Sequence, residues 1–312
     1  MNPKDNYLAA IRFQSPEYVP LGNETIWFDF QFEGNFRIDN WTDNWGVGWE
    51  VGLAGTVPFP KHNPLPSLDR LADYRFPDPN ALRFTEDMRH ALARVDRGEQ
   101  LVQGTLIYLL FERAWAIMGM ENFLTALATH PEEMRVFLHG IASYARRAFD
   151  RYLELGVDAI GFSEDLGSQR ALMMSPAMFR EFLLPEYRFC FENALRAGKI
   201  VNFHSCGCVQ AVAADLAGIG VTVLNPIQAR ANDLRRLKSD TLGRMALKGG
   251  IDTAVLAGGT PADVRAEVVR IMDILKPGGG YICEPDQGIP GIPEENMRAL
   301  WDAARQVGRY QG

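Results

Sequence analysis

KIVNFHSC (residues 199–206) is a short apolar run that ends in polar residues, and VTVLNPIQ (221–228) and RMALKGGI (244–251) repeat this pattern. Each run is followed by a polar or glycine-containing junction and then by an amphipathic helical pattern. Short apolar runs between such junctions are typical of strands buried in a parallel sheet. The same unit recurs at LVQGTLIY (101–108), DAIGFSED (158–165) and GYICEP (280–285).

The segments between these runs carry helix start and stop signals. One helical pattern begins at Pro131 and ends at Gly156, Thr260-Pro261 opens another with an N-cap, and Pro293 opens the last. Strands that alternate with helices pair in parallel through right-handed crossovers. Six strands fit after residue 100 and one or two before it, and the G-x-G-x-x-G fingerprint of dinucleotide folds is absent. We therefore predict an α/β fold, a (β/α)8 TIM barrel with its active site at the carboxyl ends of the strands.

The first hundred residues differ from the rest, because they are rich in Trp, Phe, Asn and Gly and show neither a clear helical nor a clear strand period. Trp41, Trp45 and Trp49 are spaced four apart, but the intervening glycines argue against a helix. Two interpretations stay open for Trp45, namely core packing and an aromatic wall over a flat ligand. We predict one domain over residues 1–312, in which residues 1–100 form an irregular, aromatic-rich N-terminal cap and the first barrel element.

Composition narrows the function classes. The formal net charge is −7 and no basic run is present, which argues against nucleic-acid binding. The N-terminus lacks the features of a signal peptide, and the longest apolar stretch, at residues 101–120, contains Glu112 and Arg113, which argues against a membrane span. We therefore expect a cytoplasmic protein. Four cysteines in a chain of this length do not form a disulfide scaffold and are more typical of metal binding or catalysis.

Polar side chains follow the apolar runs at the point where each strand is expected to end. In a (β/α)8 barrel these positions converge on one mouth. They supply the candidate site residues, which are Glu164, Asp165, His204, Cys206, Asn225, Gln228, Asp252, Cys283 and Gln287.

The segment HSCGC (204–208) contains the sharpest local pattern. His204 and Cys206 are two residues apart and would lie on the same face of an extended strand end. Imidazole and thiolate suit Zn²⁺, and Cys283 at the tip of a later strand could be the third ligand, which leaves the fourth position for a thiol or water. The alternative is a neutral His204 that is hydrogen-bonded in a polar mouth beside two inert cysteines.

The remaining candidates also have two interpretations each. Glu164 and Asp165 could be a general acid and base, or an acidic pair that stabilises a helix start. Asn225, Gln228 and Asp252 could bind an amide-rich ring or carboxylates, or serve in turns.

Several longer segments resemble the uroporphyrinogen decarboxylase superfamily. They are DNWGVGWE, GFSEDLGSQ with SPAMFREFLLPEY, NFHSCGCV, VLNPIQ, LKGGIDT and GGGYICEPDQGIPGIPEENMRALWDAAR. The resemblance covers nearly the whole chain and implies a single (β/α)8 barrel. True decarboxylases of the superfamily carry an arginine cluster near the N-terminus, whereas EYVPLGNETIWFDF (17–30) contains no arginine.

The resemblance therefore favours the other branch, methyltransferases that move a methyl group between a corrinoid-binding protein and a small acceptor. In thiol-acceptor members, a His-x-Cys motif and a distant Cys bind zinc. His204 and Cys206 match that motif, and Gln287 lies nearer than Cys283 to the last ligand position.

Other members of this branch pass the methyl group to tetrahydrofolate, and Asp165, Asn225, Gln228 and Asp252 would then bind the pterin. The implied methyl donor is methylcobalamin carried by the partner. The alternative function is a decarboxylase or lyase acting on a tetrapyrrole or other carboxylated substrate, with Arg170 and Lys248 as basic candidates. Decarboxylases of the superfamily are often dimers, which leaves a homodimer open.

Overall fold

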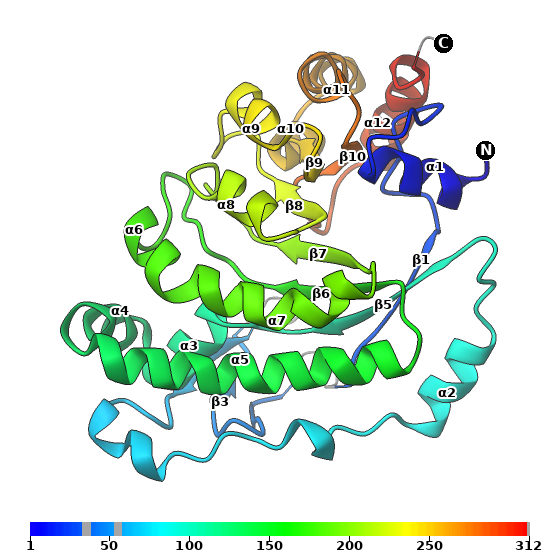
Figure 1. The fold of residues 1–312 in the computed structure, drawn as a ribbon. Helices are drawn as coiled ribbons and strands as arrows, with labels where there is room; N and C mark the ends of the chain where they lie inside the picture. Colours follow the sequence, from blue (N-terminus) through cyan, green and yellow to red (C-terminus); the bar gives the residue numbers. More distant parts are fainter. Residues whose placement is uncertain (33–38, 53–57, 311–312) are drawn as a thin grey trace.

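The computed structural model describes residues 1–32, 39–52 and 58–310, and its centre is a curved sheet of seven parallel strands (Figure 1). The strand order is β1-β5-β6-β7-β8-β9-β10, so each strand after β5 pairs with its neighbour along the chain through an outer helix. The strands are β1 (Trp27–Phe30), β5 (Leu101–Leu106), β6 (Ala159–Ser163), β7 (Ile200–His204), β8 (Val223–Ile227), β9 (Ala246–Ile251) and β10 (Tyr281–Pro285).

The segment before β1 takes the place of an eighth strand. Leu21 forms a parallel bridge with Cys283 of β10. The N–H of Cys283 donates to the carbonyl of Pro20, and the N–H of Gly22 donates to the carbonyl of Cys283, both at 2.9 Å. The same segment continues into β1, which pairs with β5. Residues 20–30 thus form one edge of the sheet as β1 and contact the other edge, β10. The TIM-barrel fold predicted from the sequence is confirmed.

Helices cover the outside of this sheet, as Figure 1 shows for α5, α7, α9 and α11. The predicted helix starts at Pro131 and Pro261 are confirmed, and the second has a capping box between Thr260 and Asp263. The helices after β5 are α3 (Phe111–Met118), α4 (Met120–Thr129), α5 (Pro131–Glu154), α6 (Pro176–Met178), the π-helical η3 (Phe179–Leu183), α7 (Leu184–Arg196), α8 (Ala213–Gly218), α9 (Leu234–Thr241), α10 (Thr253–Gly258), α11 (Pro261–Leu275) and α12 (Glu294–Val307).

An apolar layer closes the amino-terminal end of the barrel. Helix α1 (Pro3–Ile11) places Tyr7 and Ile11 against the first inward-facing side chain of successive strands. This layer consists of Leu101, Ala159, Ile200, Val223, Ala246 and Ile282. Because strand side chains alternate between faces, the residues two positions further on also point inward and lie nearer the mouth.

The N-terminal region forms a cap built on a small antiparallel sheet, β2 (Trp41–Thr42), β3 (Gly48–Glu50) and β4 (Phe59–His62). Asp43 organises it, since its carboxylate accepts from the N–H groups of Trp45 and Val47 and from the Trp49 indole, all at 2.9 Å. The same carboxylate lies 2.6 Å from the guanidinium of Arg113 on α3, which fixes the cap to the barrel.

Two 3₁₀ turns and one helix connect the cap to β5. They are η1 (Leu68–Asp73), η2 (Pro79–Ala81) and α2 (Glu86–Ala93). Among the described residues, no helix has the length and apolar character needed to cross a membrane.

Candidate functional site

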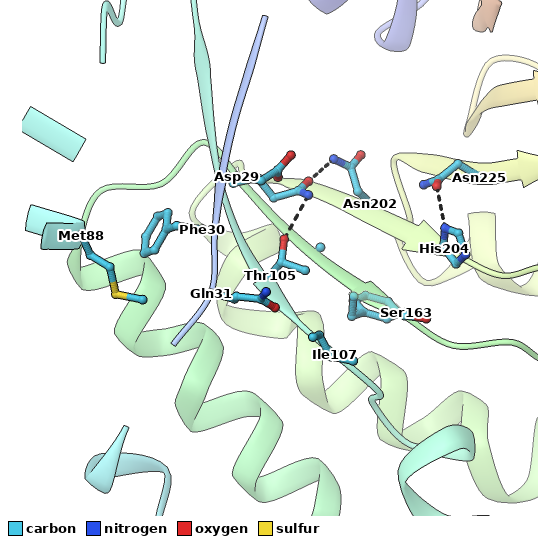
Figure 2. A pocket seen from close by; sticks show the side chains of 13 residues that line it. Asp29, Phe30, Gln31, Met88, Thr105, Ile107, Ser163, Asn202, His204 and Asn225 are labelled. Carbon is cyan, nitrogen blue, oxygen red and sulfur yellow. Dashed lines mark hydrogen bonds between the residues drawn. The ribbon is translucent and has the colours of Figure 1, made fainter. Parts of the chain in front are cut away.

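A cavity of about 800 Å³ opens at the carboxyl ends of the strands (Figure 2). Its polar walls come from two layers of inward-facing side chains above the apolar closing layer. The lower layer contributes Asp29, Gln103, Gly161 and Asn202, and the upper layer contributes Gln31, Thr105, Ser163, His204 and Asn225. The cavity is therefore polar over an apolar floor, as expected of a site that must orient a ligand as well as enclose it.

His204 is held in one orientation by Asn225. The Nδ1 atom of His204 lies 3.1 Å from Oδ1 of Asn225, whose amide nitrogen donates to the carbonyl of Phe203 at 3.4 Å. That second contact leaves the Asn225 oxygen facing the imidazole, so the ring proton resides on Nδ1. The lone pair of Nε2 then points to the neighbouring sulfur, as in a metal-binding histidine.

Asp165, His204 and Cys206 converge on one point at the rim of the cavity. Nε2 of His204 lies 3.6 Å from Sγ of Cys206 and 3.8 Å from Oδ1 of Asp165, and the three ligand atoms lie within 4.8 Å of one another. Asp165 also accepts from the Cys206 N–H at 2.8 Å, and the Gln287 amide lies 3.6 Å from the sulfur. Of the predicted residues, the structure thus brings Asp165, His204, Cys206, Asn225 and Gln287 together.

This donor set fits zinc. Zn–N and Zn–S bonds of about 2.1 and 2.3 Å at a tetrahedral angle place nitrogen and sulfur about 3.6 Å apart, which matches the separation of His204 and Cys206. The Asp165 oxygen is slightly far from His204 and half-exposed, so a small side-chain rotation brings it into range. Three protein ligands leave the fourth tetrahedral position for a ligand in the cavity.

The Cys206 thiol is not a free nucleophile at neutral pH. Burial and, second, the Asp165 carboxylate raise the pKa of Cys206 to about 12. Without a nearby cation the side chain is therefore a thiol rather than a thiolate. A metal ion is the group that would reverse this, because coordination displaces the proton.

Cys283 does not join this group, so its assignment as third ligand is wrong. On β10 its neighbours Ile282 and Glu284 face the barrel interior, where Glu284 pairs with Lys248 at 3.2 Å. Since side chains alternate along a strand, Cys283 faces the helices instead, and it is fully buried in the outer hydrophobic core. Burial raises its pKa to about 12, as expected of an inert core thiol.

Glu164 is a helix cap rather than a residue that contacts substrate. Its fully buried carboxylate accepts from the N–H groups of Leu110, Phe111 and Glu112 at 2.8, 2.5 and 3.1 Å, and from the Tyr187 hydroxyl. It therefore stabilises the N-terminus of α3, the structural alternative considered from the sequence. Burial raises its pKa to about 7 against the lowering effect of these hydrogen bonds.

Trp45 and Gln228 are also structural, which contradicts their assignment to substrate. Trp45 is 3% exposed and packs in the cap against Tyr144, with ring centroids 4.6 Å apart. Gln228 is buried, and its Oε1 accepts from the Gly207 N–H and from the Gln169 amide, both at 2.9 Å. Gln228 thereby holds the loop that carries Cys206.

Asp252 serves the turn chemistry considered as its alternative role. Its carboxylate accepts from the N–H of Ala254 at 2.8 Å as the N-cap of α10, and it pairs with Arg230. It is 7% exposed and does not line the cavity. Arg230 satisfies its charge, so no group on Asp252 is left for a ligand.

Two features of the site were missed from the sequence. Glu112 is buried beside Asp165 and accepts from the Ser163 hydroxyl at 3.0 Å; burial, then Asp165 and Glu164, raise its pKa to about 8. The lower polar layer was missed as well. The available signal was a polar residue at every second position inside an apolar strand, as in VNFH, where residues 202 and 204 share a face.

Comparisons with known proteins agree with this fold. The uroporphyrinogen decarboxylase (URO-D) family model matches residues 45–307. A methyltransferase from Methanosarcina mazei superposes with a TM-score of 0.72 at 16% identity, covering 98% of this chain and 99% of that one. A B12-independent methionine synthase from Shewanella sp. W3-18-1 superposes with a TM-score of 0.47 at 12% identity, covering 73% and 67% of the two chains. No curated protein sequence is significantly similar. Because the family model spans most of its length, this chain belongs to the uroporphyrinogen decarboxylase family.

Proposed function

We propose that this protein transfers a methyl group between a corrinoid carried by a partner protein and a small acceptor, which is a thiol or tetrahydrofolate. The observation that carries the proposal is the convergence of Asp165, His204 and Cys206 at the rim of a closed-bottom cavity. The whole-chain similarity of fold to a methyltransferase supports it. The corrinoid and the choice of acceptors come from the family resemblance.

In the thiol route, Asp165, His204 and Cys206 would hold zinc, and bound zinc would supply the acidity that converts an acceptor thiol to a thiolate. The protein's own contribution is positioning. Asn225 keeps the proton of His204 on Nδ1, and Asp165 and Gln287 hold the backbone and the sulfur of Cys206. A thiolate placed in the cavity in line with a docked methyl group needs no other general base.

The alternative, decarboxylation of a polycarboxylated tetrapyrrole, is less well supported. Such a substrate needs several cationic partners, and among the described residues that line the cavity there is no lysine or arginine. Arg170 is exposed on the loop after β6, and Lys248 is already paired with Glu284. The polar walls are amides, two hydroxyls, the His204 imidazole and one carboxylate, a set that does not suit a substrate with several negative charges.

The decisive experiment follows methylcobalamin demethylation by its absorbance, with a thiol or tetrahydrofolate supplied in turn and a methylated corrinoid protein as second donor. We expect turnover with one acceptor class, loss of the thiol reaction in His204→Gln and Cys206→Ser, and near-normal activity in Cys283→Ala. Zinc content of protein purified without added metal distinguishes the thiol route from the tetrahydrofolate route. No demethylation with either acceptor and either donor would refute the proposal.

A further inference from the structure

The wall chemistry of the cavity allows the acceptor to be described more closely. We infer that the end of the methyl acceptor that lies deepest in the barrel carries N–H donors, as an amine or a nitrogen-rich ring does, and not a carboxylate, sulfonate or phosphate. That the ligand is a methyl acceptor rests on the proposed function, but the binding preference itself follows from the cavity. Three observations carry it: the charges of the lower polar layer, the direction of its hydrogen bonds and its depth below His204.

The charges of this layer favour a donor ligand over an anion. Asp29 is the one acidic residue among those described along the cavity wall, and its side chain is accessible from the cavity. Burial raises the pKa of Asp29, and the charge of Lys248 and the hydrogen bond from Gln103 only partly offset this. Lys248 itself lies 3.2 Å from Glu284 and is neutralised there. An anionic ligand would therefore meet a carboxylate with no uncommitted cation beside it.

The direction of the hydrogen bonds in this layer points the same way. The Gln103 amide donates to the Asp29 carboxylate, which is an acceptor only, so the Gln103 carbonyl oxygen must face the other side. There it accepts from the amide nitrogen of Asn202. The Asn202 Oδ1 atom is then left buried without a hydrogen-bond partner among the described residues. A buried acceptor of this kind is costly unless a donor satisfies it.

The layer is built to keep this arrangement. A Cβ on Gly161 would lie 2.6 Å from the Gln103 amide, so only glycine lets that amide lie across the barrel. Gln103 also donates to the Thr105 hydroxyl at 3.3 Å. Asn202 lies two residues before His204 on β7, about 7 Å deeper at the rise of a strand. A small ligand anchored beside His204 can therefore reach this layer with its other end.

Two thiols with the same two-carbon spacing test the inference: cysteamine, which is an ammonium at pH 7, and 2-mercaptoethanesulfonate, which is an anion. Calorimetric titration of the zinc-loaded protein should show at least tenfold tighter binding of cysteamine. Asp29→Asn, which removes the charge but keeps the shape, should reduce this preference about tenfold, and Asn202→Ala should weaken cysteamine binding. Asp302→Asn, an exposed site on the outer helix α12, is the matched control and should change neither affinity.

Ethylamine and ethanesulfonate, which lack the thiol, repeat the comparison without the metal site, and a reduced pterin tests the ring form of the donor. Equal or tighter binding of the sulfonate, or a preference that survives Asp29→Asn in a folded variant, would overturn the inference. A preference for the amines in a protein that shows no methyl transfer would support the cavity chemistry and overturn the proposed function instead.

Discussion

Replacing Asn225 by alanine should weaken zinc binding about tenfold without unfolding the protein. Oδ1 of Asn225, 3.1 Å from Nδ1 of His204, is what keeps the imidazole proton away from Nε2. The lost hydrogen bond is worth about 1–1.5 kcal/mol, and each 1.4 kcal/mol is a factor of ten in affinity. Losses of this size, about 10–100-fold, are usual when the outer partner of a metal-binding histidine is removed.

Competition with a chromogenic zinc chelator measures this affinity directly. Asn225→Asp serves as the matched variant, because a carboxylate accepts from the same Nδ1–H and should hold zinc at least as tightly as the wild type. Circular dichroism and a thermal melt establish that both variants fold. Zinc affinity within twofold of wild type in Asn225→Ala would refute the assignment of His204 Nε2 as the ligand atom.

Three further predictions concern stability. Glu164→Ala should lower the free energy of unfolding, measured by chemical denaturation, by about 4 kcal/mol, because it leaves several buried donors unsatisfied. The folded fraction should keep its zinc stoichiometry, and loss of zinc from folded protein would contradict the role of Glu164 as a helix cap. Asp43→Ala should lower the free energy of unfolding by about 3–5 kcal/mol, because it leaves the charge of Arg113 buried and unpaired. A change below 1 kcal/mol would show that the cap does not depend on this pair. Burial lowers the pKa of Lys238 from 10.5 to about 8. Between these pH values the folded state binds fewer protons than the unfolded state, so the free energy of unfolding should rise by up to about 3 kcal/mol from pH 8 to 10.5. Lys238→Met should remove this rise, and an identical pH profile in that variant would show that Lys238 does not cause it.

Much of the fold could be predicted because its signals are local. Alternation of apolar runs with capped helices, such as those that start at Pro131 and Pro261, indicated a parallel barrel. The cap was harder, since Trp41 and Trp49 are brought together by an antiparallel pairing that neither residue spacing nor composition encodes. The pairing of residues 20–22 with β10 was equally hard to predict, because it consists of a single bridge between residues far apart in the sequence.

The site was predicted where neighbours in sequence are also neighbours in space. His204 and Cys206 share one strand end, so their spacing alone placed them together. Cys283 was assigned wrongly because its orientation depends on the phase of β10, which a short apolar run does not reveal. Glu164 and Asp165 are adjacent, yet one caps α3 and the other faces His204, a division that only the position of α3 decides.

X-ray absorption at the zinc edge tests the central claim most directly, because it counts the sulfur atoms bound to the metal. The proposed thiol route predicts one zinc per chain with a single sulfur at about 2.3 Å, from Cys206, and lighter ligands at about 2.0–2.1 Å. Addition of a thiol acceptor should raise the count from one sulfur to two. Two sulfurs without added thiol, or no bound zinc in protein that retains His204 and Cys206, would contradict the site described here.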